Sequence, residues 1–150
     1  MSIVIDASVA LAWVFGDERH DAAWAIIDRL TQGTACAPAL FPLEVANGLL
    51  VAHGRGRLSP EQTRTAVVLL EALPIEVDLE TPQQAFGATW ALASRHQLSS
   101  YDAAYLELAV RRALPIATLD GRWPTGRRPA LWDGHTAERC VAALRRRAGR

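Results

Sequence analysis

Short runs of apolar residues alternate along this chain with longer segments of helical character, and this alternation limits the possible folds. Residues 2–5 form the first run and residues 115–119 form the last, and both contain β-branched side chains. Such short apolar runs are typical of strands buried on both faces of a parallel sheet, with helices as the connections. The pattern predicts one α/β domain over residues 1–150, with a central, mostly parallel sheet flanked by helices.

Further elements follow from capping residues, from prolines suited to a first helical turn, and from glycines that end a segment. The expected strands cover residues 2–5, 34–37, 74–77 and 115–119. The expected helices cover residues 7–15, 18–32, 39–52, 59–72, 81–96, 101–113 and 136–147. Proline, glycine and arginine dominate residues 122–129, which are not expected to form a regular element.

The basic residues are all arginines, and they are unevenly distributed. Sixteen arginines balance sixteen acidic residues, and the chain has no lysine. Residues 1–110 carry six arginines against thirteen acids, whereas residues 111–150 carry ten arginines against three acids. The absence of lysine excludes a phosphate-loop lysine, a Schiff-base enzyme and a lysine general base. Recognition of phosphate would therefore depend on arginine, on backbone N–H groups or on a metal.

Cysteine content and hydropathy bear on the compartment. Cys36 and Cys140 are too few for a disulfide framework and are not spaced as zinc ligands. The apolar start is interrupted by Asp6 and lacks a preceding positive charge, so it is not expected to be a signal peptide. No apolar run reaches the length of a membrane span. We expect a cytoplasmic protein with reduced thiols and no membrane association.

Four acidic residues stand at strand ends or in apolar helices. Asp6 and Asp120 directly follow the first and last predicted strands, and ligands of parallel sheets bind at the carboxyl ends of strands. Glu44 and Asp102 lie near the starts of two largely apolar helices. Each acid alone has a structural explanation, as a helix cap, as a first-turn acid that suits the helix dipole, or as part of an Asp-Gly turn.

Taken together, the four acids favour a different explanation. Converging carboxylates repel one another, and their burial is costly unless a cation neutralises them. A set of oxygen ligands favours Mg²⁺ or Mn²⁺ over zinc. The sequence therefore predicts a divalent metal site at one edge of the sheet.

The segments around these acids resemble those of the PIN-domain nucleases. They are residues 3–9, 44–47, 117–120 and 101–109, the last of which begins Tyr-Asp-Ala-Ala-Tyr. They occur in the order of the family over residues 1–121, and a short chain of this kind resembles the VapC-type toxins of bacterial toxin–antitoxin pairs. The resemblance implies a three-layer PIN-like fold and an endoribonuclease that uses Mg²⁺ or Mn²⁺. It also implies a homodimer with a cognate antitoxin bound across its grooves.

The resemblance assigns the catalytic and metal-binding roles of the family to Asp6, Glu44, Asp102 and Asp120. One or two ions per subunit are expected. Asp6, Asp102 and Asp120 would hold one ion, and Glu44 would bind a second ion or act through water. The ion would activate water for in-line attack on an RNA phosphodiester, leaving 5′-phosphate and 3′-hydroxyl ends.

The resemblance also assigns supporting roles to three polar residues, Ser8, Asn47 and Thr118. Asn47 follows Glu44 by three residues, on the same helix face, and could orient that carboxylate or a metal-bound water. Thr118 precedes Asp120 by two residues, on the same side of the strand, and could steady it. A helix-start hydroxyl and an ordinary strand residue are the alternatives for Ser8 and Thr118.

Residues 122–150 depart from the family pattern and are rich in arginine. An acid found near this point in some members is replaced by Arg122, so the sequence does not decide between one metal site and two. Arginine pairs with phosphate and stacks on bases, so one hypothesis places the RNA path along Arg122, Arg127 and Arg128. The alternatives are solvated arginines beside tryptophans that close the core, or a contact with the tail of the antitoxin.

Other functions fit parts of the sequence. A Mg²⁺-dependent phosphatase or phosphotransferase on a similar sheet would, in its familiar versions, require a lysine. A non-catalytic PIN-like module that binds RNA or protein is the main alternative. In such a module, however, four clustered carboxylates would have no stabilising role. The kind of RNA, whether tRNA, rRNA or mRNA, stays open. The alanine- and leucine-rich helices 39–52 and 59–72 could contact a second subunit or an antitoxin helix, or could pack within the core.

Overall fold

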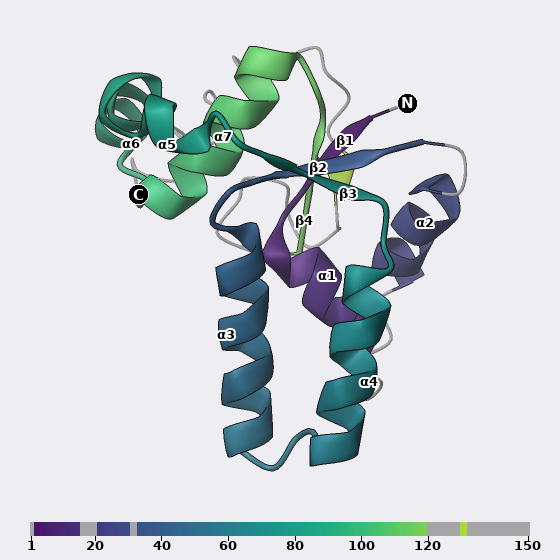
Figure 1. The fold of residues 1–150 in the computed structure, drawn as a ribbon. Helices are drawn as coiled ribbons and strands as arrows, with labels where there is room; N and C mark the ends of the chain where they lie inside the picture. Colours follow the sequence, from purple (N-terminus) through teal and green to yellow (C-terminus); the bar gives the residue numbers. More distant parts are fainter. Residues whose placement is uncertain (1, 16–20, 31–32, 120–129, 132–150) are drawn as a thin grey trace, which may run out of the picture.

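The computed structural model describes residues 2–15, 21–30, 33–119 and 130–131 (Figure 1). Its strands are β1 (Ile3–Ile5), β2 (Ala35–Pro38), β3 (Ile75–Asp78), β4 (Ile116–Thr118) and β5 (Ala130–Leu131). Its helices are α1 (Ala7–Val14), α2 (Asp21–Leu30), α3 (Phe41–Gly54), α4 (Pro60–Glu71), α5 (Thr81–Gln84), η1 (Ala85–Thr89), α6 (Trp90–His96) and α7 (Ser100–Arg112).

The strands form one five-stranded sheet in the order β3-β2-β1-β4-β5. The first four strands are parallel, and β5 is antiparallel to β4. The predicted α/β fold with a mostly parallel sheet is confirmed. All three residues of β1 and of β4 are buried, as expected for central strands covered on both faces. Since β1 lies in the middle of the sheet, the residue that follows it lies at the centre of the carboxyl edge.

The predicted helices are found within a few residues of their expected bounds wherever the structure describes them. The helix expected over residues 81–96 consists of α5, the π-helical segment η1 and α6 in succession. A π segment adds one residue to a helical turn, and the hydrophobic pattern does not indicate it. The helix expected over residues 136–147 and the irregular segment 122–129 lie outside the described residues.

Helices α3 and α4 form a long hairpin that projects from the sheet (Figure 1). The start of α4 is fixed by a reciprocal capping box between Ser59 and Gln62. Helix α3 lies close to α1 at Gly48, where an added Cβ would stand 2.4 Å from Cδ1 of Leu11. The lack of a side chain at Gly48 therefore makes room for the side chain of Leu11 between α3 and α1.

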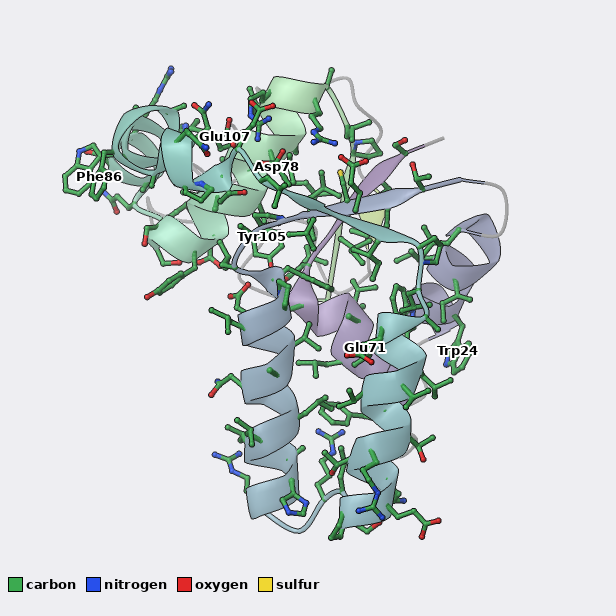
Figure 2. The ribbon with its side chains drawn as sticks, viewed as in Figure 1. Trp24, Glu71, Asp78, Phe86, Tyr105 and Glu107 are labelled. Atoms are coloured by element: carbon green, nitrogen blue, oxygen red, sulfur yellow. The ribbon has the colours of Figure 1, made fainter. Side chains whose placement is uncertain are left out.

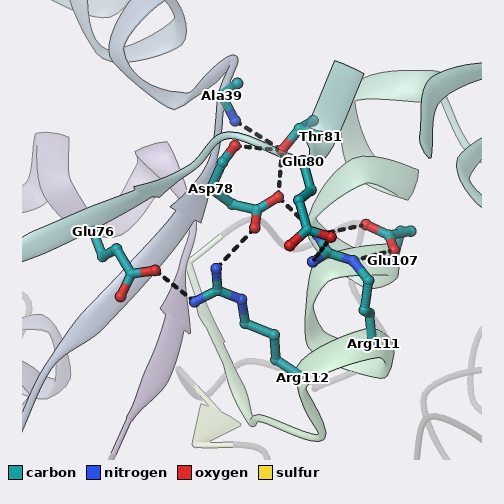
Figure 3. A network of polar contacts seen from close by, with 8 residues as sticks. All are labelled: Ala39, Glu76, Asp78, Glu80, Thr81, Glu107, Arg111 and Arg112. Atoms are coloured by element: carbon teal, nitrogen blue, oxygen red, sulfur yellow. Dashed lines mark hydrogen bonds and ion pairs between the residues drawn. The ribbon is translucent and has the colours of Figure 1, made fainter. Parts of the chain in front are cut away.

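A buried ionic network joins β3 to the end of α7 (Figure 3). Asp78 is 1% exposed and accepts hydrogen bonds from Arg111 at 2.7 Å and from Arg112 at 2.9 Å. Burial alone would raise the pKa of Asp78, but hydrogen bonds from Arg111, Thr81 and Arg112 outweigh it and lower the pKa. Arg111 also bonds to the buried Glu107 at 2.7 Å. These two arginines of the basic segment 111–150 therefore neutralise acids of the fold.

Among the described residues, no helix has the length and apolar character needed to cross a membrane.

Candidate active site

Asp6 occupies the junction between β1 and α1. It is the N-cap of α1, and its Oδ1 accepts a hydrogen bond from the backbone N–H of Ser8 at 3.4 Å. Its Oδ2 accepts two more, from the hydroxyl of Ser8 at 3.0 Å and from that of Thr118 at 2.5 Å. The capping explanation of Asp6 is therefore correct, and the same carboxylate is also held by side chains from two elements.

Ser8 and Thr118 connect α1 to β4. The hydroxyl of Ser8 accepts a hydrogen bond from the backbone N–H of Leu119 at 3.0 Å while it donates to Asp6. Thr118 was expected to steady Asp120; that expectation stays a prediction, because Asp120 lies outside the described residues. Among the described residues Thr118 contacts Asp6, because β4 pairs with β1 in parallel, with Ile5 opposite Ala117.

Asp102 lies in the first turn of α7, and Ser99 is the N-cap of that helix. The Ser99 hydroxyl donates to Oδ2 of Asp102 at 2.7 Å and accepts from its backbone N–H at 3.1 Å. The explanation of Asp102 as a first-turn acid is therefore correct. The cap fixes the half-buried carboxylate at the positive end of the helix dipole.

Glu44 lies in the first turn of α3, and its partner comes from α7. The hydroxyl of Tyr105 donates a short hydrogen bond to Oε2 of Glu44. Sequence reasoning missed Tyr105 as a site residue, although its position three residues after Asp102 places both on one helix face. Asn47 was expected to orient Glu44 or a metal-bound water. It is exposed, and among the described residues it makes no hydrogen bond to Glu44.

These three acids lie near enough that the charges of Asp6 and Asp102 act on Glu44. The pKa of Glu44 is raised, first by burial and then by the charges of Asp6 and Asp102, while the hydrogen bond from Tyr105 opposes the rise. The pKa of Tyr105 is raised well above its usual range by burial, by the hydrogen bond to Glu44, and by the charges of Glu44 and Asp6. Tyr105 is therefore a neutral donor at any physiological pH. Each of these acids would be stabilised by a nearby cation.

The donor set suits a hard divalent cation, because carboxylate and hydroxyl oxygens are the ligands that Mg²⁺ and Mn²⁺ prefer. Within the described part of the chain, no three His, Cys, Asp or Glu side chains form a ready-made metal-binding group. The fourth predicted acid, Asp120, lies outside the described residues, as do the three arginines of the predicted RNA path, Arg122, Arg127 and Arg128.

Comparison with known proteins gives the same assignment. Residues 3–127 match the PIN domain family. Ribonuclease VapC1 from Mycobacterium tuberculosis is 34% identical over 123 residues, which are 79% of this chain and 86% of that protein. Ribonuclease VapC12 from the same organism is 32% identical over 137 residues, 91% of this chain and 95% of that protein. Ribonuclease VapC3 from Pyrobaculum aerophilum is 31% identical over 124 residues, 80% of this chain and 90% of that protein.

The fold is shared with a solved structure as well. The crystal structure of VapBC2 from Rickettsia felis, bound to a DNA fragment from the promoter, contains a chain with a TM-score of 0.57 and 10% sequence identity. The match covers 80% of this chain and 89% of that one, and it shows the fold. From the family match, the three relatives and the shared fold, we conclude that the chain belongs to the PIN-domain family, among the VapC-type ribonucleases.

Proposed function

We propose that this VapC-type ribonuclease is the toxin of a toxin–antitoxin pair and hydrolyses RNA phosphodiesters with the help of Mg²⁺ or Mn²⁺. The observation that carries the metal-dependent part is the raised pKa of Glu44, which burial raises first and the charges of Asp6 and Asp102, from two other elements, raise further. Acids that destabilise one another in this way are typical of sites that bind a cation or perform chemistry.

Asp6, Asp102 and Asp120 are the residues that would hold the ion, with Glu44 completing the acidic site. When bound, the ion would acidify a water molecule and offset the negative charge that develops on the phosphate. The protein itself fixes the acids in advance: hydroxyls hold Asp6, a helix cap holds Asp102, and a buried phenol holds Glu44. Ligands fixed beforehand need little reorganisation when the cation binds.

RNA binding needs positive charge near these acids, because an acidic site alone repels phosphate. The relatives are named as ribonucleases, and we propose RNA as the substrate of this chain too. Arg122, Arg127 and Arg128 follow Asp120 closely in sequence, and we propose that they contact the RNA backbone. An RNA substrate is also the reason we propose a cytoplasmic location.

The double substitution of Arg127 and Arg128 by alanine tests this proposed RNA path. The expected result is weaker RNA binding with a shallower dependence on salt, since fewer phosphate contacts release fewer counterions. The matched control is Arg95→Ala, an exposed arginine on α6. Unchanged RNA affinity across a salt series in the double variant would remove these arginines from the RNA path.

A groove between α3 and α4 is the surface that we propose for the antitoxin. It has a volume of about 340 Å³ and reaches β3, and apart from Glu71 its described lining residues are apolar. Figure 2 shows Glu71 on the side of α4 that faces α3. An amphipathic antitoxin helix suits such a groove, with a basic residue placed against Glu71. Glu71→Lys should therefore weaken the toxin–antitoxin complex, and Glu61→Lys on the exposed face of α4 should not.

We also propose that the chain forms a homodimer and that residues 1–150 make up one PIN-like domain. Pairing of β5 with β4 supports the single domain, because it brings the chain beyond Asp120 back to the sheet.

Exposed aromatic side chains support the homodimer. Phe86 and Trp90 are 92% and 66% exposed, and Phe86 lies away from the α3–α4 hairpin that we propose for the antitoxin (Figure 2). Light scattering after size-exclusion chromatography should give twice the chain mass, and a monomer at micromolar concentration would contradict this.

Cleavage of RNA by the purified chain tests the proposed activity directly. With Mg²⁺ or Mn²⁺, wild type should cut RNA internally and leave 5′-phosphate ends, and both EDTA and Asp6→Asn should abolish cutting. The alternative function, a non-catalytic module that binds RNA or protein, predicts RNA binding without metal-dependent cleavage in wild type. Sequencing of 5′ ends after induced expression would then identify the target RNA.

A further inference from the structure

The phenolic hydroxyl of Tyr105 lies where three acid-bearing segments meet. Tyr105 belongs to α7, which also carries Asp102, and its hydroxyl donates to Glu44 on α3. The charge of Asp6 and the backbone of Ala7, the residue after Asp6, both affect the pKa of the same phenol. Tyr105 is therefore linked to each of the three segments that carry Asp6, Glu44 and Asp102.

The ring of Tyr105 is held by the core. Its residue is 2% exposed, and it packs within the main hydrophobic cluster of buried residues. A close-packed core restricts a buried aromatic ring to one orientation, so the direction of the hydroxyl is set by packing. Figure 2 shows Tyr105 at the end of α3 that carries Glu44.

Glu44 by contrast is a long, flexible side chain in an unfavourable electrostatic position. The nearby charges of Asp6 and Asp102 repel it, and without a partner the carboxylate would turn away from them. Among the residues that the structure describes, Tyr105 is its sole hydrogen-bond partner, and the bond uses Oε2. The other carboxylate oxygen, Oε1, is left for a ligand.

We propose that Tyr105 is a positioning residue that holds Glu44 by Oε2, against repulsion from Asp6 and Asp102, so that Glu44 offers Oε1 alone to a cation. The inference rests on the proposed function, because it assigns the geometry of one ligand in the proposed metal site. Glu44 would then be a ligand through one oxygen. Helix α7 would then supply both a ligand, Asp102, and the residue that holds a second ligand, Glu44.

Tyr105→Phe tests the proposal, because it removes the hydroxyl and keeps the buried ring. Isothermal titration with Mn²⁺ should show a dissociation constant raised roughly tenfold, the scale on which loss of a ligand's hydrogen-bond partner acts. The matched control is Tyr101→Phe on the same helix, where the side chain is 63% exposed and Mn²⁺ affinity should not change. In a Glu44→Ala background, Tyr105→Phe should have no further effect, since the residue acts only through Glu44.

Two further outcomes separate this inference from the proposed function. If wild type binds Mn²⁺, Asp6→Asn does not, and Tyr105→Phe binds like wild type, the positioning role is overturned and the metal site stands. If wild type and Asp6→Asn bind Mn²⁺ alike, the metal site itself fails.

Should Tyr105→Phe not fold, Glu44→Asp replaces it, because the shorter side chain keeps the charge but cannot reach the phenol. Wild-type Mn²⁺ affinity in Glu44→Asp would contradict the proposal.

Discussion

The hydroxyl of Thr118, at the end of β4, donates a 2.5 Å hydrogen bond to Asp6, which follows the adjacent strand β1. Thr118 is 2% exposed, so its orientation is fixed by the sheet. Because the two strands are parallel, their carboxyl ends meet at one edge, and the hydroxyl from one strand aligns the acid that follows the other. The two central strands β1 and β4 therefore place both the proposed ligand, Asp6, and the residue that holds it, Thr118.

Thr118→Val removes this donor and keeps the side-chain shape. Loss of a hydrogen bond to a charged group should lower the free energy of unfolding by about 1.5–3 kcal/mol, and Mn²⁺ affinity should fall at least tenfold. Chemical denaturation and calorimetric titration measure the two effects. Thr118→Ser, which keeps the hydroxyl, should retain most of both, and wild-type Mn²⁺ affinity in Thr118→Val would show that the contact does not support the site.

Glu44→Gln should separate stability from function. The folded-state pKa of Glu44 is raised by burial and by Asp6 and Asp102, so the ionised form destabilises the fold as pH rises through the interval between the unfolded and folded pKa values. Without metal at pH 7, the variant should therefore be more stable than wild type, by about 1 kcal/mol for relief of a strained functional site. At pH 3, where Glu44 of the wild type is neutral like the glutamine of the variant, the difference in the free energy of unfolding should disappear. An equally stable or less stable variant at pH 7 would contradict the pKa direction.

Arg111→Met should weaken the link between α7 and β3. It leaves the buried Asp78 and Glu107 short of a cationic partner, and breaking a buried ion pair typically costs about 3–5 kcal/mol. Since the pKa of folded Asp78 is lowered, its stabilising effect in wild type is full above the unfolded pKa of about 3.9 and is lost as pH falls through the folded pKa. Urea unfolding at pH 7 and at pH 3 measures this. Arg95→Met at an exposed site is the control, and equal losses in both variants would argue against the network.

Gly48→Val should push α3 away from α1. The new side chain would overlap Leu11, and overpacking of this kind costs about 1–3 kcal/mol in the free energy of unfolding. Leu11→Ala in the same chain should recover part of that loss, because it removes the atoms in the way. Gly54→Ala is the control, since a Cβ there meets nothing within 4 Å. A Gly48→Val variant as stable as wild type would mean that Gly48 does not set the helix spacing.

Much of the fold could be predicted from local patterns. The β-branched run before Asp6 marks a buried central strand, and Ser59-Pro60 marks the start of a helix. These signals act over a few residues and are therefore visible in sequence. The π segment η1 was not predictable, because one extra residue in a helical turn leaves the composition of that helix unchanged.

The candidate site was predictable in its acids and less so in their partners. Asp6, Glu44 and Asp102 were singled out by their apolar surroundings and by the family resemblance. Thr118 contacts Asp6 across 112 positions, and Tyr105 contacts Glu44 across 61. Such pairs depend on how elements pack, and a buried tyrosine in sequence looks like any other core aromatic. Only the folded structure, which brings the first turn of α3 within hydrogen-bond reach of the hydroxyl of Tyr105 on α7, identifies Tyr105 as a site residue.

The central claim, that Asp6, Glu44 and Asp102 serve one cation site, is tested most directly by Mn²⁺ affinity. Calorimetric titration would compare wild type with Asp6→Asn, Glu44→Gln and Asp102→Asn, and with Glu61→Gln at an exposed acid of α4 as the control. The account predicts that each of the first three substitutions weakens binding at least tenfold and that the control does not. Binding of wild-type strength in all three variants would contradict it.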